Sequence, residues 1–234
     1  MDSGHRFSDR VVWITGASSG IGEALALALA QEGARLVLSS RRVEELERVR
    51  RACARPDDHS VVPLDLARSE TFPATVEQVL KRCGRIDVLV NNGGVSQRAL
   101  AMEASLAVER TLMEVNYFGP VALTKAVLPA MKAQGAGHVV VISSVMGYLG
   151  TPGRSTYAAA KHALHGWFDS LRAEVWRHGL QVLLVCPGYV QTAVSLNAVG
   201  SDGEKHAQLD AKTARGIPPS ECATAILHAI MRNR

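Results

Sequence analysis

The stretch VVWITGASSGIGEALALALA, residues 11–30, decides the fold class. Its first five residues are apolar and rich in β-branched side chains, which is typical of a strand buried on both faces. Glycines follow at positions 16, 20 and 22, and the alanine- and leucine-rich segment after them predicts a helix. A strand, a glycine-rich turn and a helix in immediate succession indicate the first unit of a parallel α/β sheet.

The same alternation continues along the chain. Short apolar runs lie at 35–40, 61–66, 86–91, 138–143 and 181–186, with helix-length segments at 20–31, 43–53, 72–83, 103–134 and 155–178. This order predicts one α/β domain over residues 1–234, a Rossmann-type, doubly wound parallel sheet with helices on both faces. Residues 193–218 are polar and punctuated by glycine, so we expect a mobile, functional segment over one end of the sheet.

Composition excludes several other classes of protein. Hydrophobic residues make up 47% and charged residues 21%, with a formal net charge of +4. In the densest basic segment, 41–51, glutamates alternate with arginines, so we do not expect nucleic-acid binding. The four cysteines are far apart and indicate neither a metal site nor a disulfide framework. The polar N-terminus and the lack of a long apolar run predict a cytoplasmic protein without a membrane span.

The glycine-rich turn predicts a dinucleotide site. Gly16, Gly20 and Gly22 let the backbone approach a pyrophosphate, and the helix that follows directs free N–H groups at that anion. The spacing is a weak signal alone, but its place between the first strand and the first helix is the one that dinucleotide binding requires. The same turn also matches G-x-S-x-G, the nucleophile elbow of serine hydrolases, which is a remote alternative because no acid and histidine follow later strands convincingly.

The end of the second predicted strand indicates which dinucleotide binds. Ser40 lies at its tip, where an acidic residue would accept hydrogen bonds from the ribose hydroxyls of NAD, and Arg41 follows. A guanidinium suits the extra 2′-phosphate of NADP, so we expect NADP(H) as the cofactor. The alternative is that Arg41 is a solvent-exposed arginine at the start of a helix.

The stretch STYAAAKHAL, residues 155–164, places a phenol and an ammonium one helical turn apart. Tyr157 and Lys161 therefore lie on the same face of a predicted helix, within reach of one ligand. Taken alone, the pair could equally be a half-buried tyrosine and a surface lysine.

Six motifs in order resemble the short-chain dehydrogenase/reductase (SDR) family: TGASSGIG (15–22), NNGG (91–94), VNY (115–117), ISSVMG (142–147), YAAAK (157–161) and CPGYVQT (186–192). Each motif is weak alone, whereas the ordered set is specific. The stretches at 36–51 and 91–98 further resemble the subgroup of dehydrogenase/reductase member 7 and its relatives. Several of those relatives are membrane-anchored, and we expect no anchor here. Members of the family usually end with a further strand, which is missing from the sequence pattern.

The resemblance implies a catalytic set. Tyr157 would be the general acid or base, and Lys161 would lower its pKa, ordinarily about 10, and reach the nicotinamide ribose. Ser144 would hold the substrate oxygen, with Ser143 as the neighbouring candidate. Asn116 would hold a water for proton relay, unless it only bonds to the helix backbone.

The resemblance also implies a cofactor site. Asp65 would accept from the adenine amine, Asn91 would pack near the adenosine ribose, and Thr192 would lie near the carboxamide. Gly93 replaces an alanine that is common in the family. The full set is Gly16, Ser18, Ser19, Gly20, Ile21, Gly22, Arg41, Asp65, Leu66, Asn91, Gly93, Tyr157, Lys161, Pro187, Gly188, Val190 and Thr192.

The expected activity is hydride transfer between NADP(H) and a hydrophobic carbonyl or secondary alcohol, such as a steroid, retinoid or lipid. Mostly apolar candidate pocket walls favour such a substrate: Met146, Tyr148, Leu149, Tyr189 and Leu196. A 3-ketoacyl-type reductase and a non-catalytic NADP-binding regulator are the alternatives. The resemblance further implies a homodimer or homotetramer built on the helices at 103–134 and 155–178.

Overall fold

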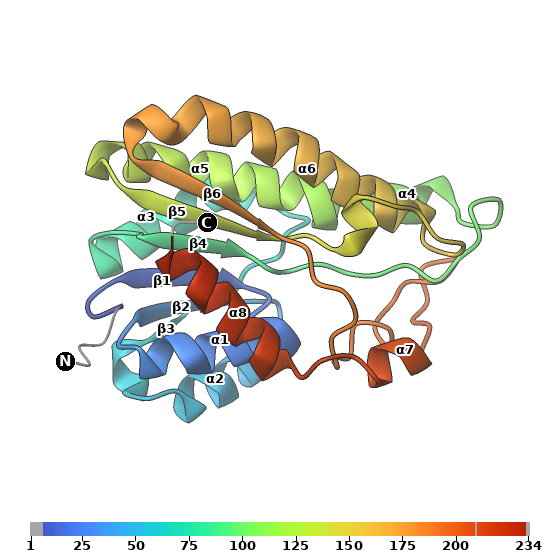
Figure 1. Ribbon diagram of the computed structural model, residues 1–234, viewed down its shortest axis with the longest axis horizontal. Helices are drawn as coiled ribbons and strands as arrows, with labels where there is room; N and C mark the ends of the chain where they lie inside the picture. The colour runs from blue at the N-terminus through green and yellow to red at the C-terminus, as the bar shows by residue number, and fades with distance from the viewer. Residues whose placement is uncertain (1–6, 209, 233–234) are drawn as a thin grey trace.

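The structure, a computed structural model, describes residues 7–208 and 210–232. Over these residues the chain forms a six-stranded parallel sheet with the order β3-β2-β1-β4-β5-β6 (Figure 1). The strands are β1 (Val11–Thr15), β2 (Arg35–Ser39), β3 (Ser60–Val61), β4 (Val88–Asn91), β5 (Gly137–Ile142) and β6 (Leu180–Val185). The predicted fold class, a doubly wound Rossmann-type sheet, is confirmed.

Helices cover both faces of this sheet (Figure 1). One face carries α1 (Gly20–Gln31), α2 (Val43–Ala52) and α8 (Pro219–Met231), and the other carries α3 (Phe72–Cys83), α5 (Gly119–Gln134) and α6 (Ser155–Val175). In β1, Val12 and Ile14 pack into the first layer, while Val11 and Trp13 pack into the second. Both faces of the strand are buried, and this is why its sequence is continuously apolar.

Several element boundaries differ from the predicted ones. β3 ends at Val61, although the amides of Val62 and Leu64 still donate to carbonyls on the β2 side at 3.0 and 3.1 Å. The helix predicted over 103–134 begins at Leu106 and consists of α4 (Leu106–Met113), a π turn (Glu114–Phe118) and α5. The helix predicted to end at 178 closes with a 3₁₀ turn, Trp176–His178.

The last helix, α8, completes the layer that contains α1. Its buried Cys222, Ile226 and Ile230 belong to the same apolar cluster as Leu25 and Leu29 of α1. Over the described residues, β6 forms the edge of the sheet beyond β5. None of the helices that these residues form is long and apolar enough to cross a membrane.

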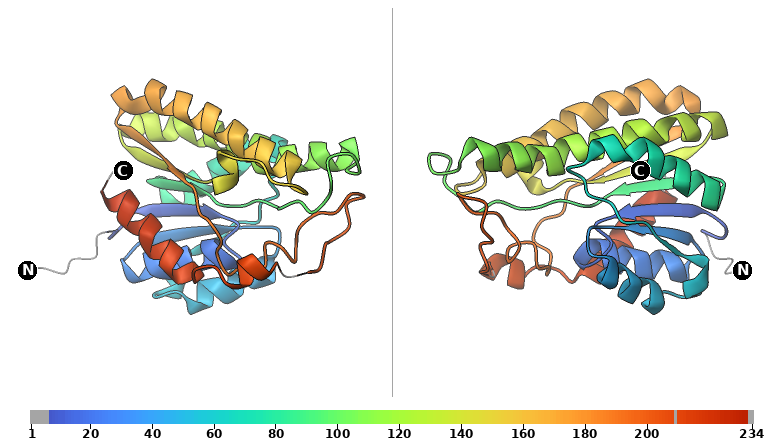
Figure 2. Two further views of the ribbon diagram at one scale, coloured as in Figure 1. Left: turned by 45° about the vertical axis from the view of Figure 1, so that its right-hand side comes forward. Right: turned by 180° about the vertical axis from the view of Figure 1, so that it is seen from behind.

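Hydrogen bonds anchor the 193–218 segment to its surroundings. Residue 209 lies outside the residues that the structure describes. The Arg98 amide donates to Val199 O at 2.8 Å, and the Val199 amide donates to Ser96 O at 2.9 Å. Near its end, the Ile217 amide donates to Tyr189 O at 3.0 Å, and the short helix α7 (Ala211–Ala214) lies between these anchors. Figure 2 shows the segment, in orange and red, beyond the carboxyl ends of the strands. These hydrogen bonds join the segment to the loop after β4 and to the residues after β6, and a functional role of the segment stays a prediction.

Candidate active site

The predicted site residues gather along one edge of the sheet. All strands are parallel, so their carboxyl ends meet there, and the order of the strands reverses between β1 and β4. Open α/β sheets bind ligands at such a reversal. The glycine-rich turn follows β1, NNGG follows β4, Ser144 follows β5 and CPG follows β6.

Close packing makes glycine necessary in the turn after β1. Gly16 and Gly20 have φ values of +65° and +61°, a left-handed conformation that side chains disfavour. A Cβ at Gly16 would lie 2.7 Å from the Cα of Gly93, and one at Gly22 would lie 2.4 Å from Gly16 O. A Cβ at Gly20 would lie 3.0 Å from Thr192 Cγ2, so the turn also contacts the segment after β6.

Two polar residues that sequence reasoning missed fix this turn. Asn92 Nδ2 donates to the carbonyls of Thr15 and Gly16 at 3.0 and 3.1 Å. Thr15 Oγ1 accepts from the amides of Asn92 and Gly93, both at 3.0 Å. The end of β4 is therefore bonded to the end of β1. Polar residues directly after a buried strand were the available signal.

Arg42, the neighbour of the predicted Arg41, contacts the glycine-rich turn. Its Nη2 donates to Ser18 Oγ at 3.0 Å and to Ser19 Oγ at 2.9 Å, although both arginines are exposed. Binding of a 2′-phosphate by Arg41 stays a prediction. The contact also weakens the hydrolase alternative, because a guanidinium has no acceptor for the proton of a nucleophilic serine.

Ser144, Tyr157 and Lys161 converge beside the end of β5. Lys161 is buried, its Nζ donates to Ile142 O at 2.8 Å, and it lies 5.6 Å from the centroid of the Tyr157 ring. Ser144 Oγ accepts from the Met146 amide at 3.1 Å and also bonds to Tyr157. Ser143, the neighbouring candidate, instead contacts His165 Nε2 at 2.8 Å. The geometry therefore favours Ser144 over Ser143 as the partner of the tyrosine.

Burial governs the protonation of this pair. It raises the pKa of Tyr157, against the hydrogen bond from Ser144 and the charge of Arg154, which lower it. It lowers the pKa of Lys161 to about 8. The expectation that Lys161 lowers the tyrosine pKa is thus not met, because the lysine is itself desolvated and its ammonium is bonded to the Ile142 carbonyl.

Gln97 positions the helix that carries Tyr157, and sequence reasoning missed it. The first amides of a helix lack partners within the helix. Gln97 Oε1 accepts from the amides of Thr156 and Tyr157 at 2.9 and 3.1 Å, and its side chain is completely buried. A residue from the loop after β4 therefore caps α6, which no local sequence pattern around residue 155 would reveal.

Asn116 lies in the π turn between α4 and α5. Its Nδ2 donates to Leu112 O and Val95 O at 2.9 and 3.0 Å, and its Oδ1 accepts from the Val95 amide at 3.0 Å. The side chain therefore bonds to the backbone of both the helix and the loop after β4, and its role in holding a water stays a prediction. It ties the loop after β4 to the helix that passes beside the site.

The remaining predicted cofactor residues lie along the same edge. Asn91 Nδ2 donates to Thr124 Oγ1 at 2.9 Å, whereas its buried Oδ1 has no partner among the described residues. Asp65 Oδ1 accepts from the Ala67 amide at 3.1 Å, next to the buried Leu66. The carbonyl of Pro187 accepts from the Val145 amide at 3.1 Å, which joins the segments after β5 and β6.

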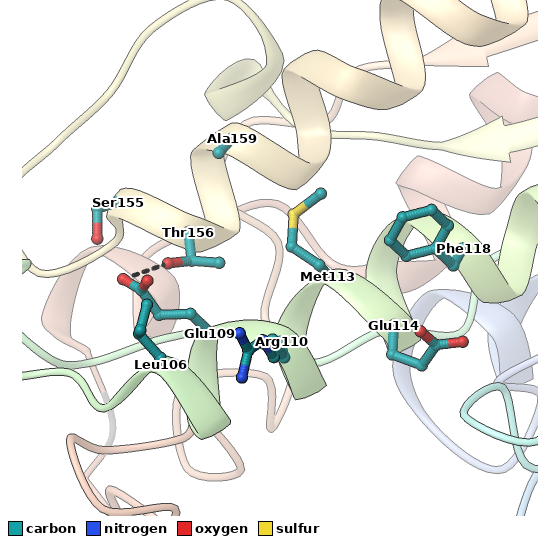
Figure 3. A pocket seen from close by; sticks show the side chains of 9 residues that line it. All are labelled: Leu106, Glu109, Arg110, Met113, Glu114, Phe118, Ser155, Thr156 and Ala159. Atoms are coloured by element: carbon teal, nitrogen blue, oxygen red, sulfur yellow. Dashed lines mark hydrogen bonds between the residues drawn. The ribbon is translucent and has the colours of Figure 1, made fainter.

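The predicted pocket walls do not form one enclosed cavity. Met146 is buried, while Tyr148, Leu149, Tyr189 and Leu196 are exposed. A hollow of about 620 Å³ lies instead between α4, the π turn and α6. Figure 3 shows Met113 extending from α4 toward α6 and the 3.0 Å hydrogen bond from Thr156 to Glu109. The residues that line this hollow are Leu106, Glu109, Arg110, Met113, Glu114, Phe118, Ser155, Thr156 and Ala159.

The sheet order, the glycine-rich turn and the Ser144–Tyr157–Lys161 set define a Rossmann-type oxidoreductase. Residues 10–201 match the family model described as short chain dehydrogenase. The chain belongs to the short-chain dehydrogenase/reductase family. It is 47% identical over 230 residues to the "Dehydrogenase/reductase SDR family protein 7-like" of Anopheles gambiae, covering 96% of this chain and 73% of that protein.

Solved structures share this fold. A metagenomic short-chain oxidoreductase in complex with NADP is 31% identical with a TM-score of 0.79, covering 97% of this chain and 92% of that one. A short chain dehydrogenase/reductase from Burkholderia phymatum in complex with NAD is 26% identical with a TM-score of 0.86, covering 98% and 88%. The fold therefore occurs with either cofactor.

Proposed function

We propose that the chain transfers a hydride between NADP(H) and a hydrophobic carbonyl compound or secondary alcohol, with Tyr157 as general acid or base. The observation that carries this proposal is the convergence of Ser144, Tyr157 and Lys161 at the end of β5. The residues present fit a dinucleotide, because the positive φ of Gly16 and Gly20 forms a tight turn after β1 that leads into the N-terminus of α1, where free amides suit a pyrophosphate. When bound, NADPH supplies the hydride.

The protein residues supply the proton and hold the reacting oxygen. Tyr157 is protonated near neutral pH even at the ordinary pKa of about 10, and burial raises that pKa further, so the residue enters the reduction as a proton donor. The Ser144 hydroxyl lies beside the tyrosine, and when substrate binds it can turn its one proton to the same oxygen and orient it. Lys161, a buried lysine whose pKa is about 8, can supply a proton that replaces the one lost by Tyr157. These residues argue against a non-catalytic regulator.

The preference for NADP(H) is supported by the charge at the end of β2. Ser40 is followed by two arginines, with no carboxylate at the tip of the strand, and Arg42 already bonds to the glycine-rich turn. The Arg42 guanidinium at this turn and the adjacent Arg41 after β2 favour a 2′-phosphate. The two ribose hydroxyls of NAD are uncharged, so they gain less binding energy from these arginines.

Fluorescence titration with NADPH and NADH tests the cofactor. We expect tighter binding of NADPH, and we expect Arg41→Ala and Arg42→Ala each to weaken NADPH binding by about tenfold while leaving NADH binding unchanged. Arg51→Ala, on the exposed side of α2, is the charge-matched control. Tighter binding of NADH by the unmodified protein would refute the NADP(H) assignment.

We further propose that two or four copies assemble through α4, α5 and α6. The exposed Leu106 and Phe118, 66% and 49% accessible, lie beside the hollow between α4 and α6 (Figure 3). Apolar side chains around a hollow are typical of a protein interface. A cytoplasmic location stays a prediction.

A further inference from the structure

Two arginines share one carboxylate oxygen near the catalytic tyrosine. Arg98 Nη2 lies 2.5 Å and Arg154 Nη2 lies 3.3 Å from Oδ2 of Asp210. Arg98 belongs to the loop after β4, Arg154 directly precedes α6, and Asp210 precedes α7 in the 193–218 segment. The three side chains are only 16%, 14% and 24% exposed, so the cluster is partly enclosed.

The cluster has more positive than negative charge. Asp210 Oδ1 accepts from the amides of Lys212 and Thr213 at 2.8 and 3.2 Å, so this oxygen caps α7. Two guanidinium groups therefore share Oδ2 of one carboxylate, because Oδ1 already accepts from the α7 amides. Burial, and to a smaller extent the neighbouring Arg154, lower the pKa of Arg98, whereas Asp210 raises it. Each guanidinium has five N–H donors, enough to bind a further anion beside Asp210.

A buried donor next to this cluster also has no acceptor. Gln97 adjoins Arg98, and its Oε1 caps the amides of Thr156 and Tyr157. Its Nε2 is buried and has no hydrogen-bond partner within residues 7–208 and 210–232. An unpaired buried N–H group is costly, so native proteins seldom leave one without a ligand. Gln97 is thus next to Arg98 in the sequence and caps the helix that Arg154 directly precedes.

We propose that Arg98 and Arg154 bind a carboxylate carried by the substrate, so that the preferred substrates are hydrophobic carbonyl compounds with an anionic end. The inference rests on the proposed function and adds a substrate class to it. Asp210 demonstrates that a carboxylate fits between the two guanidinium groups. Arg154 directly precedes α6 and Tyr157 lies in the first turn of that helix, so the anionic end binds close to the residue that protonates the carbonyl.

The test uses aldehyde-terminated fatty acids of increasing length and their methyl esters, which share a carbonyl and differ in charge. We expect the unmodified protein with NADPH to favour at least one acid over its ester by about tenfold in kcat/KM, mainly through KM. Arg98→Gln removes this preference, because it lowers kcat/KM on the acid by about tenfold more than on the ester. Arg177→Gln, an exposed arginine at the other end of α6, is the control and keeps the preference.

Asp210→Asn separates substrate recognition from simple anchoring of the segment. Asparagine keeps an oxygen for the α7 cap and removes the competing charge, so the preference for the acid increases. Equal losses on acid and ester in Arg98→Gln and Asp210→Asn would show that the cluster is only an anchor, and would overturn the inference.

Calorimetric titration of the protein–NADPH complex distinguishes failure of the inference from failure of the proposed function. We expect the acid to bind more tightly than the ester, and Arg98→Gln to abolish the difference. Equal affinity for acid and ester would overturn the inference and leave the oxidoreductase proposal standing. Selective binding of the acid without turnover of any compound would refute the proposed activity instead.

Discussion

Lys161 is a buried residue of the proposed active site, and its protonation also affects the stability of the fold. It lies in a site closed on one side by the end of β5, and its ammonium is bonded to a carbonyl rather than to a carboxylate. A lone cation in such surroundings loses its proton more easily than in water. The pKa of about 8 allows the lysine to exchange protons near physiological pH.

The free energy of unfolding should depend on pH because of this shifted pKa. Below pH 8 the lysine is charged in both states and its burial penalty is fully present. Between about pH 8 and 10 the folded state loses the proton while the unfolded state keeps it, so stability rises with pH, by about 3 kcal/mol at most. In urea unfolding experiments, the free energy of unfolding of Lys161→Met should not rise over this pH range.

Lys132→Met, an exposed lysine on α5, is the control for that measurement. It should keep the pH dependence of the unmodified protein. If Lys161→Met and the unmodified protein showed the same dependence on pH, the shifted pKa of Lys161 would be wrong.

At the scale of elements, the glycine-rich turn depends on contacts with the end of β4. Gly16 meets backbone and the fixed amide of Asn92, whereas a Cβ at Gly93 would lie 2.7 Å from Leu66 Cδ1, the movable end of a side chain. The two glycines are neighbours in space, yet they differ in what an added methyl group would displace.

Chemical denaturation of two alanine variants tests this difference. We expect Gly16→Ala to lower the free energy of unfolding by about 2–4 kcal/mol, because it combines a positive φ with a backbone clash. We expect Gly93→Ala to cost about 1 kcal/mol or less, since Leu66 can rotate away. Equal losses of unfolding free energy in the two variants would mean that packing of the turn does not explain why glycine is needed at position 16.

The elements also show what the sequence could and could not predict. Continuous apolar runs predicted the strands because both faces of each strand are buried, as Val12 and Trp13 illustrate. Arg42 and Gln97 were missed because their roles depend on which loops the fold brings together. Gln97 lies 60 positions before Tyr157, whose amide it caps. Such contacts follow from the order of the strands and not from local spacing.

At the scale of the whole molecule, the proposed assembly depends on the face formed by α4, α5 and α6. Leu106→Asp, at the exposed start of α4, should place a charge in the interface and shift the protein to monomers in sedimentation experiments. Val43→Asp, an exposed apolar position on α2, should leave the assembly intact. An unmodified protein that is monomeric would contradict the assembly proposal.

The account as a whole depends on Tyr157 as the residue that transfers the proton. Tyr157→Phe removes one hydroxyl, while Gln97 still caps α6 through the backbone amide and the glycine-rich turn is unchanged. The decisive measurement is the rate of NADPH oxidation by Tyr157→Phe with a hydrophobic carbonyl substrate, beside a titration of the same variant with NADPH. The account predicts that NADPH affinity stays within about threefold and that turnover falls by roughly a hundredfold or more. Turnover close to that of the unmodified protein, with NADPH still bound, would contradict it.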